Sequence, residues 1–252
     1  MSNMRVNRVK SKLATGERAA VLSGLPTPDL IDLVGPTEID GVWIEAEHGD
    51  VDFSDIADHS RAADLWGKTP IVRVNQNDEA LIYRTLDRGA QGIVVPHVNT
   101  REEAEAVVQA AKFAPIGRRG MYTSRQGYGV SNYFSVANDH TLLVVLIEDI
   151  EAVNNLDEIL SVDNIDVFFV APSDLAQTMG HIGDNMHPDV QSTVADTLTR
   201  INNAGRCPGT LATDSTLDHL VNLGARFIMQ SINAWLENAA SDYATKINDS
   251  KG

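Results

Sequence analysis

The sequence predicts a closed (β/α)8 TIM barrel, and three observations lead to this prediction. Eight short apolar runs recur along the 252 residues, with helix-like segments between them. The runs are nearly continuous in apolar residues, as strands buried on both faces of a parallel sheet are. About 250 residues is also the usual length of such a barrel. A doubly wound open sheet is the alternative, but the Gly-rich first turn typical of that fold is missing, because the first run is followed by Ser-Gly-Leu-Pro.

The predicted strands are rich in Val, Ile and Leu. The fourth and fifth runs, GIVV and LLVVLI, contain no charged residue, so both faces of these strands should be buried. In chain order the eight strands cover residues 19–22, 42–45, 71–74, 92–95, 142–147, 166–170, 209–212 and 226–230.

The segments between the strands carry start and stop signals for helices. Thr27 followed by Pro28 offers an N-cap and a proline in the first turn. Thr100 with Glu103 three residues later matches a capping box. The other predicted helices cover residues 54–67, 149–160, 188–204, 215–223 and 234–247.

Two segments lack regular periodicity. Residues 114–140 contain Gly-Arg-Arg-Gly and tyrosines near Gly127 and Gly129, and a segment of this length is expected to be a functional or interface loop that contributes to substrate specificity. Residues 181–187 form a second polar loop with two histidines. No domain boundary is visible, so residues 1–252 are predicted to form one domain.

Composition and charge narrow the classes of function. The chain has 20 Lys plus Arg and 35 acidic residues, a formal net charge of −15. Such a negative protein repels nucleic acid and anionic lipid, so neither is an expected partner. The single cysteine, Cys207, cannot form an internal disulfide, and no segment is apolar enough for a membrane helix or signal peptide. A cytoplasmic protein is expected.

Polar residues follow several predicted strands at their carboxyl ends, where barrel enzymes have their active sites. Glu45, Glu47 and His48 end the second strand, and Arg73 lies in the third. Two further groups complete the rim: Glu148 and Asp149 follow the fifth strand, and Ser173 and Asp174 follow the sixth.

This set of residue types indicates metal-assisted chemistry. Carboxylates gathered at the mouth of a barrel repel one another unless a cation joins them, and Mg²⁺ and Mn²⁺ prefer oxygen ligands. Glu148 and Asp174 are the best pair of ligands, and two protein ligands leave positions open for substrate. Histidine supplies an acid or base and arginine stabilises an oxyanion, so His48 and Arg73 suit the formation of an enolate.

Each of these residues also has a structural explanation. Asp174 could be a helix N-cap, and His48 could be an ordinary loop histidine. Arg73 lies between two valines in a buried pattern, so it needs an anionic partner. His97 ends the fourth strand and could face the pocket as a substrate contact.

The same residues resemble the HpcH/HpaI family of metal-dependent, class II pyruvate aldolases. The similarity runs in consistent order from about residue 7 to residue 235. Its motifs are Trp-Ile-Glu-Ala-Glu-His-Gly at 43–49, Ile-Val-Arg-Val at 71–74, Leu-Asp-Arg-Gly-Ala-Gln-Gly at 86–92, Pro-Ile-Gly-Arg-Arg-Gly at 115–120, Ile-Glu at 147–148 and Ala-Pro-Ser-Asp-Leu at 171–175.

The resemblance implies a role for each residue. Glu148 and Asp174 would hold Mg²⁺ or Mn²⁺, with Co²⁺ or Zn²⁺ as substitutes, and Arg73 would contact the C2 oxygen of pyruvate. His48, paired with Asp87, would act as acid or base on the aldehyde half of the substrate. Backbone N–H groups of Ser173 and Asp174 would bind the pyruvate carboxylate.

The resemblance also implies an assembly, commonly a hexamer, in which the last helix is exchanged between subunits. The expected reaction is cleavage or formation of a 4-hydroxy-2-oxo acid from pyruvate and an aldehyde.

The chain departs from the family pattern at four positions, which are Glu45, Leu146, Ala171 and Asn233. These changes affect the expected substrate preference, because residues around a metal site orient its ligands. Two alternatives therefore stay open: a citryl-CoA-lyase-like or other metal-enolate enzyme, and a non-catalytic barrel that binds an oxo acid.

Overall fold

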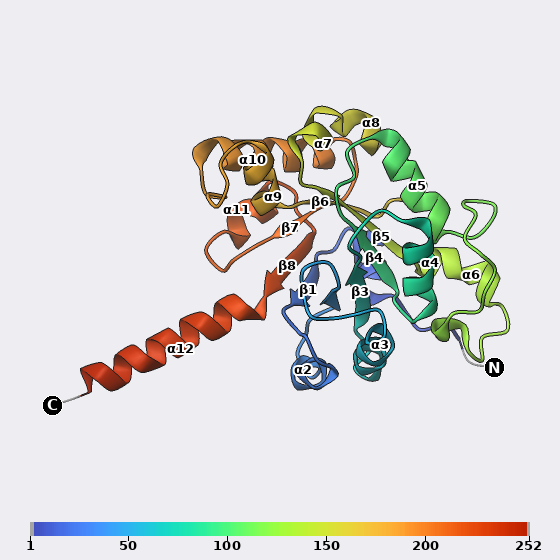
Figure 1. The fold of residues 1–252 in the computed structure, drawn as a ribbon, viewed down its shortest axis with the longest axis horizontal. Helices are drawn as coiled ribbons and strands as arrows, with labels where there is room; N and C mark the ends of the chain where they lie inside the picture. Colours follow the sequence, from blue (N-terminus) through green and yellow to red (C-terminus); the bar gives the residue numbers. More distant parts are fainter. Residues whose placement is uncertain (1–2, 251–252) are drawn as a thin grey trace.

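A closed barrel of eight parallel strands forms the centre of the computed structural model, which describes residues 3–250 (Figure 1). Each strand pairs with its neighbours in the sequence, and β1 closes the barrel against β8. The strands are β1 Ala19–Ser23, β2 Gly41–Glu45, β3 Thr69–Arg73, β4 Gly92–Val95, β5 Leu142–Ile147, β6 Val167–Val170, β7 Pro208–Leu211 and β8 Phe227–Ser231. The predicted barrel is confirmed, every predicted strand lies within two residues of its observed bounds, and the open-sheet alternative is wrong.

Helices surround the barrel and connect its strands. They are α1 Arg8–Ala14, α2 Pro28–Val34, α3 Ile56–Leu65, α4 Glu79–Asp87, α5 Arg101–Ala111, α6 Tyr133–His140, α7 Ile150–Asn154, α8 Leu156–Leu160, α9 Pro172–Thr178, α10 Pro188–Asn203, α11 Leu217–Asn222 and α12 Ile232–Asp249. The predicted capping box is present: the Thr100 hydroxyl accepts a hydrogen bond from the Glu103 N–H, and the Glu103 side chain returns to the Thr100 N–H.

Two predicted segments differ from the structure. The helix expected over 149–160 is interrupted at Asn155, whose side-chain amide donates to the carbonyl of Asn99 at 2.9 Å. The segment 114–140, expected to be irregular, contains the short 3-10 turn Arg125–Gly127 and helix α6. Tyr133 of α6 packs edge-on against Phe113, with ring centroids 6.0 Å apart. Helix α6 is therefore stabilised by contacts with residues distant in sequence, which its own pattern does not reveal.

Two hydrophobic cores hold the barrel. The larger one lies between strands and helices and includes Ile44, Ile82 and Val107. The smaller one fills the barrel interior, where Trp43 packs against Phe169 with ring centroids 5.4 Å apart. The interior is thus a packed core that supports a site at one end.

Helix α1 belongs to the interior core at the opposite end of the barrel. Its residues Val9 and Leu13 join the inner cluster, and the N–H of Val9 donates to the Thr69 hydroxyl at 3.2 Å, at the start of β3. The N-terminal end of the barrel is therefore covered, and the C-terminal end is left for the site.

Helix α12 extends away from the barrel (Figure 1). Apart from Ile232 at its base, none of its residues is buried. Even its large apolar side chains are in contact with solvent, since Leu236 is 61% exposed and Tyr243 is 68% exposed. Within residues 3–250, no helix combines the length and apolar character that a membrane span requires.

Candidate active site

Four of the predicted site residues, His48, Arg73, Ser173 and Asp174, gather at the C-terminal end of the barrel around a cavity of about 390 Å³. Trp43, Leu146, Phe169 and Met229 give it an apolar floor, and the polar lining side chains come from several strand ends. The polar lining residues are Ser23, Glu45, His48, Arg73, Ser173 and Asp174.

Glu45 organises the turn that follows β2. Its Oε1 atom accepts hydrogen bonds from the backbone N–H groups of Glu47 at 2.9 Å and His48 at 3.1 Å. A Cβ atom at Gly49 would lie 2.9 Å from the Glu45 carbonyl oxygen, so the turn requires glycine there. The sequence placed Glu45 among the polar residues at the end of the second strand and marked it as a departure from the family pattern. The structure adds that Glu45 holds the backbone of His48 at the rim.

Arg73 lies at the end of β3 and contacts two carboxylates. Its Nη2 lies 2.8 Å from Glu45 Oε2 and its Nη1 lies 2.9 Å from Glu47 Oε2. The expectation of an anionic partner is therefore met twice. Although burial opposes the shift, the charge and hydrogen bonds of Arg73 lower the pKa of Glu45.

Glu148 is the most buried carboxylate of the site. The residue Glu148 is only 1% exposed. Its Oε1 atom accepts a hydrogen bond from the His97 N–H at 2.8 Å, whereas Oε2 has no hydrogen-bond partner among residues 3–250. Burial raises the pKa of Glu148 to about 7, and the negative charges of Asp174 and Glu47 add to the rise against the opposing effect of His97. An unpaired, buried carboxylate oxygen beside two other carboxylates is an environment that a cation would stabilise.

Asp174 lies in the first turn of α9, immediately after β6. The N-cap of α9 is Ala171, so Asp174 does not fill the capping role that was its structural explanation. Strand β6 is the neighbour of β5, where Ile147 pairs with Val170. The two proposed metal ligands therefore come from adjacent strands, and their charges interact.

His97 contacts acidic residues of the rim instead of lining the cavity. Its Nδ1 lies 2.9 Å from Asp149 Oδ2, and it has a positive φ of 51°. Burial lowers the pKa of His97, but the hydrogen bond that the imidazole donates to Asp149 and the charge of Glu148 outweigh burial and raise it. The sequence suggested that His97 could contact the substrate. In the structure its backbone N–H donates a hydrogen bond to Glu148, and its side chain does not line the cavity.

His48 lies between two cavities. It lines the cavity already described and a second one of about 370 Å³, bounded by the loops after β1 and β2 and by the base of α12. Its side chain is 69% exposed, and Nε2 lies 3.8 Å from Glu47 Oε2. The imidazole is therefore accessible to a molecule in either cavity.

Asp87 does not meet His48 within the chain. It ends α4, which follows β3 and so runs back toward the N-terminal end of the barrel, whereas His48 lies at the C-terminal end. Its Oδ1 accepts a hydrogen bond from Arg119 Nη2 at 2.7 Å. Burial raises the pKa of Asp87 against the effect of this arginine.

The segment 114–140 also lies at the N-terminal end, because it connects α5 to β5. Connections from a helix to the next strand lie at the N-terminal end of the barrel, whereas the cavity lies at the C-terminal end. The segment therefore cannot contribute to substrate specificity in the cavity of its own chain. This prediction is wrong within one subunit.

Comparison with known proteins gives consistent results. The model of the HpcH/HpaI aldolase/citrate lyase family matches residues 18–235. A hydroxypyruvate/pyruvate aldolase of Roseobacter denitrificans is 34% identical over 248 residues, which are 96% of this chain and 97% of that protein. A 4-hydroxy-2-oxo-heptane-1,7-dioate aldolase of Klebsiella pneumoniae is 33% identical, over 91% of this chain and 89% of that protein.

A solved structure gives the same result. The crystal structure of a HpcH/HpaI aldolase/citrate lyase family protein from Burkholderia cenocepacia superposes with a TM-score of 0.90 at 28% identity. The superposition covers 96% of this chain and 100% of that protein.

Proposed function

The chain belongs to the HpcH/HpaI aldolase/citrate lyase family, a family of carbon–carbon lyases, and we propose that it is a class II pyruvate aldolase that cleaves or forms 4-hydroxy-2-oxo acids. Pyruvate would be the nucleophilic half and an aldehyde the other half. The proposal rests on one observation about Glu148: its buried Oε2 atom has no hydrogen-bond partner among the described residues. Asp174 and Arg73 line the neighbouring cavity.

Glu148 and Asp174 would hold the divalent ion. Both offer carboxylate oxygens, which suits Mg²⁺ or Mn²⁺, and Co²⁺ or Zn²⁺ could replace them. When bound, such an ion would stabilise negative charge on the oxygens of pyruvate. The raised pKa of Glu148 supports this assignment, because burial and then the neighbouring negative charges disfavour its carboxylate until a cation offsets them.

Arg73 would stabilise the C2 oxygen as it gains negative charge. The guanidinium is held by Glu45 and Glu47, so little reorganisation would be needed when charge develops. The backbone N–H groups of Ser173 and Asp174 would bind the pyruvate carboxylate on the α9 side of the cavity. Pyruvate would then have its reactive methyl carbon facing the rest of the cavity.

His48 would move a proton to or from the hydroxyl of the aldehyde half. Its position between the two cavities supports this role, because a substrate that spans both passes the imidazole. Asp87 could join it only from a second copy of the chain, since the two residues lie at opposite ends of one barrel. An oligomer is therefore part of the proposal, with the hexamer of the family as its expected form.

The proposal is tested by removing and restoring the metal. Treatment with a chelator should abolish cleavage of a 4-hydroxy-2-oxo acid, and added Mn²⁺ or Mg²⁺ should restore it. Glu148→Gln should lower kcat/KM by about 10²-fold or more, because the amide replaces a charged ligand. Glu151→Gln, on the exposed side of α7, is the matched control.

The same assays separate the alternatives. Trapping of a released aldehyde supports the aldolase, whereas exchange of pyruvate methyl protons into deuterated water without aldehyde indicates another metal-enolate enzyme. Binding of pyruvate without exchange indicates an oxo-acid-binding barrel. Full cleavage activity in Glu148→Gln or after chelation contradicts the metal role.

A further inference from the structure

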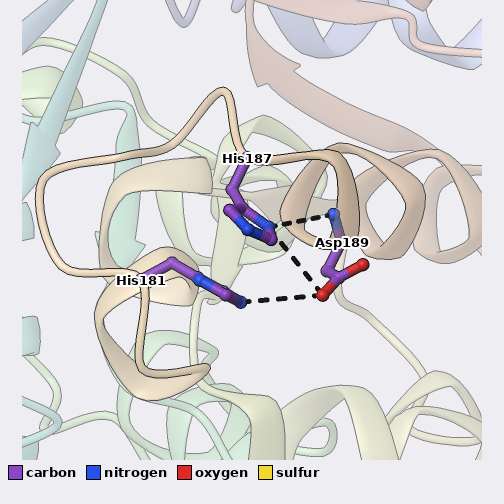
Figure 2. Close-up of side chains that lie close together, drawn as sticks. All are labelled: His181, His187 and Asp189. Atoms are coloured by element: carbon purple, nitrogen blue, oxygen red, sulfur yellow. Dashed lines mark hydrogen bonds and ion pairs between the residues drawn. The ribbon is translucent and has the colours of Figure 1, made fainter.

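The connection between α9 and α10 brings two imidazoles and a carboxylate together away from the proposed active site (Figure 2). His181 Nε2 and His187 Nδ1 each lie 3.8 Å from Asp189 Oδ2. Among residues 3–250, this is the one group of three or more His, Cys, Asp or Glu side chains whose ligand atoms lie within 4.8 Å of one another. The proposed function does not use these residues.

The backbone of the connection is already ordered for this arrangement. The N–H of His181 donates to the carbonyl of Ala176 at 2.7 Å, and the N–H of His187 donates to that of Asp184 at 3.1 Å. Gly180 and Gly183 have positive φ angles, 86° and 78°, which let the chain turn once before His181 and again between the two histidines. These backbone hydrogen bonds and turns bring the three side chains together.

Both histidines present a ring nitrogen to the Asp189 carboxylate. His187 Nδ1 accepts a hydrogen bond from the Asp189 N–H at 3.2 Å, and a metal bound to this nitrogen would replace that hydrogen bond. The two imidazole rings are stacked, with centroids 3.6 Å apart and planes inclined by 16°. Because the lone pair of an imidazole nitrogen lies in the ring plane, the two stacked rings would turn toward a shared ion on binding.

We propose that His181, His187 and Asp189 form a second metal site, which takes a transition-metal dication of the Zn²⁺ class. Imidazole nitrogens suit Zn²⁺, Ni²⁺, Co²⁺ and Cu²⁺, whereas Mg²⁺ prefers oxygen ligands. Neighbouring ligand atoms of a tetrahedral zinc site lie about 3.3 Å apart, so the 3.8 Å separations need to close by only a few tenths of an ångström. Three protein ligands and one water would complete the site.

The bound ion would link the connection to the first turn of α10. Asp189 belongs to α10, and His181 follows α9, which carries Asp174 at its start. An ion at the second site would thus restrain the helix that positions a residue of the proposed active site. It would stabilise the folded chain by mass action, because the unfolded chain has no preformed site.

Binding of Zn²⁺ to metal-free protein in the presence of excess Mg²⁺ tests the proposal. We expect the wild type to retain one Zn²⁺ per chain in equilibrium dialysis, and Zn²⁺ to raise its Tm. His181→Phe keeps a ring beside His187 but removes the ligand nitrogen, and Asp189→Asn removes the charge. Each should weaken Zn²⁺ binding by about tenfold or more. Visible absorption of bound Co²⁺ should change in the same variants.

The controls distinguish this site from the active site. His219→Phe, an exposed histidine on α11, should bind Zn²⁺ like the wild type, and so should Glu148→Gln. The Tm of each metal-free variant reports whether it folds. The proposal is overturned if the wild type loses Zn²⁺ to Mg²⁺, if folded His181→Phe binds as tightly as the wild type, or if only Glu148→Gln loses the ion.

Discussion

At the scale of single residues, Arg73 illustrates how a cation is kept inside a barrel. Its side chain is only 15% exposed, and an unpaired guanidinium there would be costly. Glu45 and Glu47 each contact it within 3 Å. The planar guanidinium has five N–H donors spread over three nitrogens, so it can pair with both carboxylates and still offer a donor to the cavity, whereas the three donors of an ammonium group diverge from one atom.

Arg73→Lys should therefore damage catalysis more than binding of the metal. We expect kcat to fall by about 10²-fold, because one donor aimed at a developing oxyanion is lost. The affinity for Mn²⁺ should stay within about twofold of the wild type. Steady-state kinetics and Mn²⁺ titration measure the two effects. Arg101→Lys, in an exposed pair with Glu105, is the control, and equal kcat in the two variants would contradict the role of Arg73.

At the scale of elements, the capping box of α5 is a local signal with a measurable value. The Thr100 hydroxyl satisfies one N–H of the first turn, and Glu103 satisfies the N–H of Thr100 itself. Thr100→Ala should lower the free energy of unfolding by about 1 kcal/mol. Thr100→Ser keeps the hydroxyl and should recover most of the loss. Chemical unfolding followed by circular dichroism checks this, and an unchanged midpoint in Thr100→Ala would contradict it.

The C-terminal end of α5 carries a buried amine. Lys112 is 2% exposed, and its Nζ donates to the carbonyls of Asn138 and Thr141, both at 2.7 Å. Burial, reinforced by the positive charge of Lys10, lowers the pKa of Lys112 to about 7, although Asp166 opposes the shift. Two carbonyl acceptors match the two N–H bonds of a neutral amine.

The stability of the protein should consequently rise with pH through this lysine. In the unfolded chain Lys112 keeps its proton up to about pH 10.4, so between pH 7 and that value the unfolded state binds more protons than the folded one. Its contribution to the free energy of unfolding should increase by about 1 kcal/mol per pH unit. Urea unfolding at pH 7.5 and 9 measures the increase, and Lys112→Met should lack it. Equal pH dependence in the two proteins would contradict the shift.

At the scale of the whole molecule, α12 is an element without a partner inside the chain. Leu236, Tyr243 and Ile247 lie on one stripe of this 18-residue helix. Each is at least half exposed, at 61%, 68% and 50%. A helix this exposed gains little stability by itself, so a second copy of the chain is its expected partner. The same assembly could bring Asp87 to His48.

Tyr243→Glu should therefore reduce the size of the assembly. A charge on the apolar stripe would have to be buried against the second copy, which is unfavourable. Thr245→Glu adds the same charge about 200° around the helix and should leave the assembly intact. Size-exclusion chromatography with light scattering measures the mass. A monomeric wild type, or equal masses for the two variants, would contradict the proposed exchange.

The sequence by itself determined the barrel and the rim on which the polar residues lie. Both depend on properties that run along the chain, namely the apolar runs, the caps and the fixed direction of each strand. This is why Glu45, Arg73 and Asp174 could be assigned to one cavity from their positions after strands.

Only the tertiary structure decided which side chains meet. The structure shows that the His97 N–H donates to Glu148, that Arg119 donates to Asp87, and that His181 and His187 lie beside Asp189. These contacts join different elements or depend on how a loop turns. Their distances follow from packing and backbone angles, for which a linear pattern carries no signal.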